Sequence, residues 1–204
     1  LSEEYDYIYS ACGVHPEEVD GLPENYIEIL RELSKNKKCV AIGEIGLDYY
    51  WRQDNKEAQK RVFEEQILLA KELNLPIIVH DREAHEDTLN ILKKHKPKGV
   101  LHCFSGSAEM AKEVLKLGMY IGLGGALTFK NARKPVEVAE MLPLEKLLLE
   151  TDCPYMAPVP MRGKRNYSAY IPYVAEKVAE IKCIAPQEVL DITSKNAKEL
   201  FNIK

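Results

Sequence analysis

Residues 147–154 read Leu-Leu-Leu-Glu-Thr-Asp-Cys-Pro, and they organise the interpretation of the whole chain. Three leucines that end on polar residues are typical of a short buried strand in a parallel sheet. Asp152 follows this strand, and the closely spaced prolines after it exclude a regular helix or strand. Three cations then follow within four positions, at Arg162, Lys164 and Arg165. An acid beside a stiff basic loop suits a metal ion and an anionic substrate, although a solvated loop with a helix-capping Asp has the same pattern.

Length and composition restrict the class of protein. A chain of 204 residues can bury about 70% of its unfolded surface in one core. The net charge of −4 argues against bulk electrostatic binding of nucleic acid but allows a local basic rim. The five cysteines form no CxxC pair and are odd in number, which predicts buried thiols and a cytoplasmic, reducing location. No apolar run approaches the ~20 residues of a membrane span, residues 1–4 do not resemble a signal peptide, and no obligate protein partner is indicated.

Six apolar segments alternate with helical patterns along the chain. Strands are predicted at 7–13, 39–43, 76–80, 99–103, 119–123 and 146–150. One helix is predicted to start at Pro23, and a second follows an Asp54–Glu57 capping box and runs to Leu73. A third passes through Leu89 and Leu92, and a fourth starts at Ser107. The remaining helices are predicted at 135–142, 171–181, 186–192 and 194–201. Regular alternation predicts parallel strands joined by right-handed crossovers. We therefore expect a single α/β domain over residues 1–204.

Five ionisable residues fall at or just beyond the ends of different predicted strands: His15, Glu44, His80, His102 and Asp152. Strand ends of parallel α/β folds form the functional face, so these residues together predict a metal site. Taken singly, His80 could be a satisfied core histidine and His15 could only shape the turn before Pro16. Imidazoles and carboxylates suit Zn²⁺, Mn²⁺ or Mg²⁺.

Each candidate residue can be given a chemical role. A carboxylate such as Glu44 can bridge two cations about 3.5–4 Å apart. Asp152 can ligate a metal and also accept a proton from water. Arg162 offers a planar fork for a phosphate, and His15 is a second candidate for substrate binding. The aromatic run 49–51 could stack on bases, but we expect it to fill space between the sheet and the helices.

Several motifs resemble those of TatD-type metal-dependent deoxyribonucleases. They are Gly-Val-His-Pro at 13–16, Gly-Glu-Ile-Gly-Leu-Asp-Tyr at 43–49, Val-His at 79–80, His-Cys-Phe-Ser-Gly at 102–106, Leu-Leu-Glu-Thr-Asp at 148–152 and Pro-Val-Pro-Met-Arg-Gly-Lys-Arg-Asn at 158–166. The resemblance covers the whole chain and implies a TIM-type (β/α)8 barrel of the amidohydrolase type that hydrolyses nucleic acid, DNA rather than RNA. It implies that Glu44 bridges two divalent metal ions, that His80 and His102 are ligands, and that Asp152 is both ligand and base.

The chain departs from this pattern in one respect. The family's first strand ends in a His-x-His pair, which this sequence does not contain. Six strand–helix units instead of eight suggest strands three to eight only, with roughly 50 residues of such a barrel missing upstream. Two other functions remain open: a small-molecule amidohydrolase or lactonase on the same barrel, and a non-catalytic barrel that lacks the histidine pair.

Overall fold

The computed structural model describes residues 1–203 of the chain. Within these residues, six strands hydrogen-bond in the order β1-β2-β3-β4-β5-β6. The strands are Ser10–Cys12 (β1), Cys39–Asp48 (β2), Ile77–Arg82 (β3), Gly99–Leu101 (β4), Tyr120–Leu123 (β5) and Leu147–Leu149 (β6). The pairs β1–β2, β2–β3 and β5–β6 are parallel, as the alternating pattern predicts.

Helices separate the strands along the chain. The α-helices are Tyr26–Leu33 (α1), Lys56–Glu72 (α2), His85–His95 (α3), Ala108–Lys116 (α4), Arg133–Met141 (α5), Ile171–Lys182 (α6) and Pro186–Phe201 (α7). Short 3-10 helices are Pro16–Glu18 (η1), Gly125–Thr128 (η2), Leu144–Lys146 (η3) and Ser168–Tyr170 (η4). The predicted α/β architecture is thereby confirmed. Among the described residues, no helix combines the length and the apolar character that a membrane crossing requires.

The chain divides into two compact units. Leu1–Val100 and the end of the chain from Leu200 form the first, and Leu101–Glu199 forms the second. The single barrel domain predicted for residues 1–204 stays a prediction.

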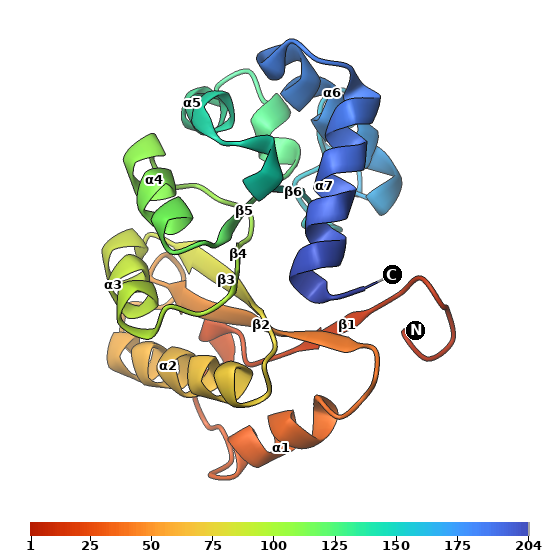
Figure 1. Cartoon of the computed structure of the whole chain (residues 1–204). Helices are drawn as coiled ribbons and strands as arrows, with labels where there is room; N and C mark the ends of the chain where they lie inside the picture. Colours follow the sequence, from red (N-terminus) through yellow and green to blue (C-terminus); the bar gives the residue numbers. More distant parts are fainter. Residues whose placement is uncertain (204) are drawn as a thin grey trace. The chain divides into compact units, whose positions relative to one another are not determined.

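In the first unit, β2 is the central strand between β1 and β3. Ile42, Ile45 and Leu47 are fully buried, since a parallel strand covered on both faces is apolar on both sides. Helix α2 lies along these strands (Figure 1) and buries an apolar face that includes Phe63 and Ile67. The long, rigid β2 thus carries the residues of the candidate site.

In the second unit, β5 and β6 pair in register, with Ile121 opposite Leu147. The buried Asn196 of α7 donates its amide to the carbonyl oxygens of Leu144 at 2.6 Å and Leu147 at 2.8 Å. Since these carbonyls precede and begin β6, the contact fixes the strand on which Glu150 and Asp152 depend.

Three predicted elements differ from the structure. Strand β2 does not end at Glu44 but continues to Asp48, because a register shift between Ile42 and Ile45 lets the pairing with β3 resume. Helix α7 is continuous where a break near residue 193 was predicted. The Thr193 hydroxyl donates to the carbonyl of Val189 at 2.8 Å, so it is satisfied inside the helix.

The predicted capping box of α2 is also wrong. The N-cap is Asn55, with no capping bond from its side chain, and Asp54 instead accepts from Arg52 at 3.1 Å. Asn74 and Gly118, which follow the ends of α2 and α4, adopt positive φ, as is common for residues just after a helix. Ser107 caps α4 as predicted, accepting from the Met110 backbone at 3.3 Å.

The cysteines differ in part from the sequence prediction, and the apolar residues of α1 are only partly buried. Cys39 is buried, but Cys153 and Cys183 are exposed, since each lies in a segment outside the packed helices and strands. In α1, Leu30 is buried whereas Leu33 is exposed, because the short helix turns only part of its apolar face inward.

Candidate metal centre

Glu44 lies inside β2, at the register shift between Ile42 and Ile45. A bulge of this kind redirects one side chain away from the regular alternation. The side chain of Glu44 is 37% exposed, while Ile42 and Ile45 around it are fully buried. The bulge therefore presents a carboxylate from an otherwise apolar strand.

His15 follows β1 and caps η1. Its Nδ1 accepts from the backbone N–H of Glu17 at 3.4 Å, which fixes the ring, and its Nε2 lies 3.6 Å from Oε2 of Glu44. His15 therefore does shape the turn before Pro16, and the same geometry aims the other ring nitrogen at Glu44.

His80 lies on β3, next to β2, and contacts two acids. Its Nδ1 is 3.7 Å from Oε2 of Glu44, and its Nε2 is 3.0 Å from Oδ2 of Asp48. Because a carboxylate only accepts, Nε2 of His80 carries the proton in this contact. Gly46 opposes His80 in the sheet, and a Cβ at Gly46 would overlap the His80 carbonyl oxygen, so the close approach of the strands requires glycine.

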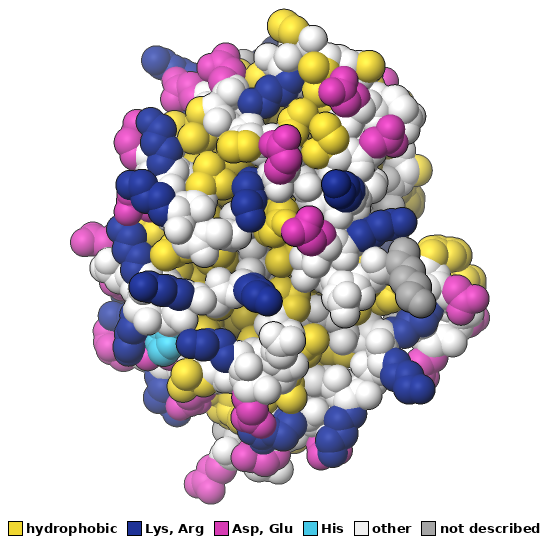
Figure 2. Space-filling model, viewed as in Figure 1, with side chains coloured by type: hydrophobic (Ala, Val, Ile, Leu, Met, Phe, Trp, Pro, Cys, Tyr) yellow, Lys and Arg dark blue, Asp and Glu magenta, His cyan; other side chains and the backbone are white. Residues whose placement is uncertain are grey.

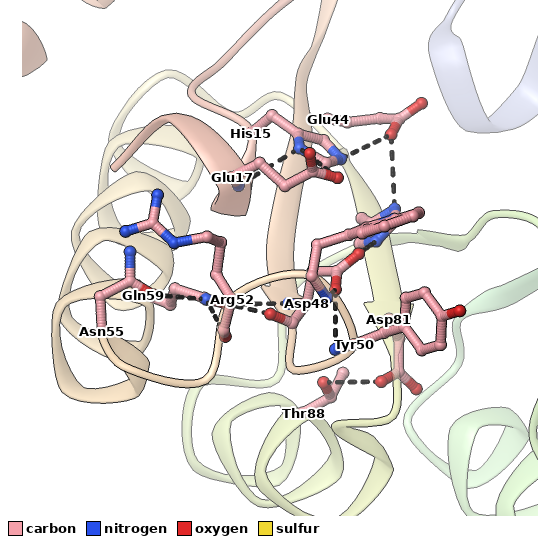
Figure 3. A network of polar contacts seen from close by, with 12 residues as sticks. His15, Glu17, Glu44, Asp48, Tyr50, Arg52, Asn55, Gln59, Asp81 and Thr88 are labelled. Atoms are coloured by element: carbon pink, nitrogen blue, oxygen red, sulfur yellow. Dashed lines mark hydrogen bonds and ion pairs between the residues drawn. The ribbon is translucent and has the colours of Figure 1, made fainter. Parts of the chain in front are cut away.

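Figure 3 shows His15, Glu44 and Asp48 in one polar network. One ligand atom each from His15, Glu44 and His80 lies within 4.8 Å of the others. Two imidazoles and one carboxylate are a fitting donor set for a divalent cation such as Zn²⁺ or Mn²⁺. Asp48 on the far nitrogen of His80 is the usual partner that orients a metal-binding histidine.

Two buried glutamines of α2 position this group. Gln59 accepts from the Asp48 backbone N–H at 2.8 Å and donates to the Asp48 carbonyl at 3.0 Å. Gln66 accepts from Val14 N–H at 2.7 Å and donates to the Val14 carbonyl at 3.1 Å. Seven residues apart, the two side chains lie on one face of the helix. They hold the end of β2 and the segment before His15 against the same rigid element.

His102 belongs to the second unit, just after β4. Its Nδ1 lies 3.5 Å from Oε2 of Glu150, whose other oxygen accepts from the backbone N–H of Cys103. A Cβ at Gly122 would lie 3.2 Å from both the Glu150 carboxyl carbon and the His102 Cα, so glycine makes room for the pair. An acid thus holds this histidine as Asp48 holds His80.

Asp152 stands beyond β6 with a positive φ of 53°. Its carbonyl accepts from the backbone N–H of Tyr155 at 2.9 Å. The buried Asn166 donates its amide to the carbonyls of Thr151 at 2.6 Å and Tyr155 at 2.7 Å. Asn166 therefore fixes the loop on both sides of Asp152.

Arg162 stacks over an aromatic ring of its own unit. Its guanidinium carbon lies 4.2 Å from the centre of the Phe129 ring. Stacking of this kind holds the planar group while its N–H edge stays available to a phosphate. On the face drawn in Figure 2, lysine and arginine side chains are interspersed with acidic ones, in keeping with the net charge of −4.

The aromatic run after β2 splits between two environments. Tyr49 is buried, and its hydroxyl donates to Asp87 at 2.7 Å. Burial raises the pKa of Tyr49 most, and the hydrogen bond to Asp87 raises it further. Tyr50 and Trp51 are 53% and 59% exposed. The prediction that the run fills internal space is right for Tyr49 and wrong for its two neighbours, because the chain leaves the sheet at Asp48.

Comparison with known proteins identifies the family. The model of TatD-related DNases matches residues 1–202 of this chain. A metal-dependent hydrolase of Bacillus subtilis strain 168, YabD, described as uncharacterized, is 51% identical over all of this chain and 81% of its own length. This chain belongs to the TatD-related DNase family.

Other TatD relatives agree in sequence and fold. The protein named 3'-5' ssDNA/RNA exonuclease TatD of Erwinia tasmaniensis is 37% identical over 97% of this chain and 80% of its own length. The crystal structure of the TatD homolog YJJV from Escherichia coli K12 superposes with a TM-score of 0.93 and 34% identity, over 100% of this chain and 80% of that chain. These likenesses confirm the predicted TIM-type barrel class and place the chain among the metal-dependent hydrolases of the TatD family. The numbering of its strands as three to eight stays a prediction.

The sequence motifs did not reveal the residues that hydrogen-bond to the predicted metal-binding side chains or to the backbone next to them. The strand predicted at 39–43 stops before Asp48, whereas Asp48 ends β2 and is fully buried. The strand pattern at 146–150 indicates Glu150 only as a polar strand end, and the helix pattern up to Leu73 gives Gln59 and Gln66 no special role. The signal available in the sequence was the spacing of Gln59 and Gln66, which lie seven positions apart on the same helix face as the buried apolar residues.

Proposed function

We propose that this protein hydrolyses phosphodiester bonds of nucleic acid, with DNA as the substrate, at a divalent-metal site that includes His15, Glu44 and His80. The observation that carries the proposal is the clustering of these three ligand atoms within 4.8 Å, with Asp48 orienting His80. Membership of a family described as TatD-related DNases supports the choice of substrate. A relative named as a 3'-5' ssDNA/RNA exonuclease supports it further.

The donor set indicates which residues bind the metal. In this proposal His15, Glu44 and His80 are ligands, and His102 and Asp152 are further ligands on the strength of their strand-end positions. We propose two divalent cations, Zn²⁺, Mn²⁺ or Mg²⁺, and the Glu44 carboxylate would be a ligand that both could share. A bound cation would supply Lewis acidity toward a phosphoryl oxygen and would lower the pKa of a bound water molecule to about 7.

Residues of this chain perform the remaining chemistry. Asp152 accepts the proton that the attacking water loses as its oxygen bonds to phosphorus, and it returns this proton to the sugar oxygen whose bond to phosphorus breaks. Arg162, oriented by its stacking on Phe129, contacts a phosphate of the substrate through its N–H edge. Asn166 keeps Asp152 in place through the loop carbonyls that it binds.

The proposal is tested with Asp152→Asn, which keeps the shape of the side chain but cannot take a proton. Hydrolysis of a single-stranded oligonucleotide at saturating Mn²⁺ should fall by roughly 10²–10⁴. Circular dichroism should show unchanged helix content. The matched control is Asp191→Asn, an exposed acid of α7 whose carboxylate only accepts from Gln187.

Two results would contradict the proposal. One is near-normal oligonucleotide hydrolysis by Asp152→Asn. The other is that the wild-type protein, with each of Zn²⁺, Mn²⁺ and Mg²⁺, hydrolyses simple lactones but no oligonucleotide. That outcome is expected if the protein is a small-molecule amidohydrolase or lactonase.

A further inference from the structure

An exposed aromatic pair lies directly after the strand that carries the metal ligands. Tyr50 and Trp51 are 53% and 59% exposed, and their rings meet edge to face with centres 4.8 Å apart at 87°. Exposed aromatic residues are common on protein surfaces, and this pair is distinguished by its position directly after β2.

Arg82, the last residue of β3, completes this surface. Its guanidinium carbon lies 4.2 Å from the ring centre of Tyr50 and 5.5 Å from that of Trp51. Cation–π attraction holds the arginine against both rings. We call Tyr50, Trp51 and Arg82 the aromatic platform. Aromatic rings combined with an arginine plane are what proteins use to stack unpaired bases.

The platform is fixed to the metal centre by one side chain. Oδ1 of Asp48 accepts from the backbone N–H groups of Tyr50 and Trp51, each at 2.9 Å. Oδ2 of the same carboxylate lies 3.0 Å from Nε2 of His80. Figure 3 shows Tyr50 beside Asp48 in the network that also contains His15 and Glu44. Because Asp48 is fully buried, the platform and the ligand His80 are held in a fixed relation.

We propose that the aromatic platform stacks an unpaired base of the nucleic-acid substrate next to the phosphate that is cut. This inference rests on the proposed function and adds to it the residues that contact a base of the substrate. A paired base is covered by its neighbours on both faces, whereas an unpaired base offers a free π face to Trp51 or Tyr50. The positive charge of Arg82 adds attraction for the adjoining phosphate.

Trp51 reports directly on its own role, since it is the only tryptophan of the chain. The metal-loaded protein is titrated with a thymidine oligonucleotide whose phosphorothioate linkages resist cutting, and with an abasic oligomer of equal length. We expect the first to quench tryptophan fluorescence and the second to leave it nearly unchanged. Quenching by a neutral oligosaccharide instead of the oligonucleotide would overturn the inference.

Variants separate stacking from general binding. Trp51→Ala and Tyr50→Ala should each weaken binding of a labelled thymidine oligonucleotide, measured by fluorescence anisotropy, by about 5- to 100-fold. Binding of the abasic oligomer should change by about twofold or less in both variants. Trp51→Phe should recover most of the loss. The control is Tyr7→Ala, a tyrosine of the same unit that is 78% exposed and lies near Tyr5.

The outcomes for the inference and for the proposed function differ. If the wild type cuts DNA but the platform variants bind it like Tyr7→Ala, the inference fails and the function stands. The inference also fails if both variants lose the abasic oligomer as strongly as the thymidine oligonucleotide. Base-dependent quenching by a protein that cuts no nucleic acid would support the platform and contradict the function.

Discussion

Asp48→Asn should weaken metal binding while preserving the fold, and the reason lies in how the two oxygens of Asp48 are used. Oδ1 accepts two backbone N–H groups at 2.9 Å, so the carbonyl oxygen of an asparagine must take that position. The amide NH₂ then occupies the position of Oδ2, which lies 3.0 Å from Nε2 of His80. An NH₂ group donates, so Nε2 must accept and the ring proton moves to Nδ1. Nδ1 is the atom that faces Glu44.

The expected cost follows from this change of tautomer. Loss of an orienting partner of a metal-binding histidine typically lowers metal affinity by about 10–100-fold. This corresponds to about 1.4–2.8 kcal/mol of binding free energy. Isothermal titration of the metal-free protein with Zn²⁺ or Mn²⁺ measures it. The nitrogen chemical shifts of His80 should report the exchange of the protonated atom, and activity should recover at high metal concentration.

The matched control is Asp81→Asn on the neighbouring strand. The Asp81 side chain is also largely buried, at 6% exposed, and its Oδ2 lies 2.7 Å from Nδ1 of His85, a histidine outside the proposed ligands. The same chemical change should therefore leave metal affinity as in the wild type. The reasoning is refuted if Asp48→Asn binds metal with unchanged affinity, or if Asp81→Asn loses as much.

Two further variants test the frame around the site. Gly46→Ala should lower the free energy of unfolding by about 3 kcal/mol or more, because the new Cβ would overlap the His80 carbonyl. The control Gly21→Ala should lower it by about 1–2 kcal/mol, because Gly21 has a positive φ but no atom within 4 Å of the new Cβ. Equal urea midpoints for the two variants would contradict this. Glu64 lies 2.7 Å from Lys94 and 3.2 Å from His95, and mainly the Lys94 bond holds the pKa of Glu64 below its ordinary 4.5. A carboxylate whose pKa is lowered by folding stabilises the folded protein above pH 4.5, and this contribution is lost as the pH falls through the folded-state pKa. The wild type should therefore be more stable than Glu64→Gln at pH 7, and the difference in unfolding free energy should shrink in acid. A difference independent of pH would count against the ion pair.

Much of the frame was predictable because it depends on local properties. Six apolar segments separated by helical patterns predicted all six strands, and the helix predicted up to Leu73 ends at Glu72. The strand-end rule for parallel sheets also selected the candidates His15, Glu44, His80, His102 and Asp152, since it needs only the order of the elements. In the structure, Glu44 lies inside β2 and His80 inside β3, because both strands continue past the predicted ends.

The partners of these residues depended on tertiary structure. Asp48 and His80 are 32 positions apart and meet because β2 and β3 pair in parallel across Gly46. Glu150 and Cys103 are 47 positions apart and are in contact in the structure, in which β6, the strand before Glu150, pairs with β5. Such contacts are set by register, and a bulge such as that at Glu44 shifts register without a distinct sequence signal.

The exposure of Tyr50 and Trp51 was likewise decided by the fold. An aromatic run after a strand has the same sequence pattern whether it fills the core or faces solvent. Tyr49 turns inward to reach Asp87, while Asp48 holds the next two residues in a turn that leads away from the sheet. The sequence by itself determined the order of the strands and helices and which residues are candidates for the chemistry. Only the tertiary structure decided which atoms of those residues are held, and by what, because hydrogen-bond partners distant in sequence are chosen by packing.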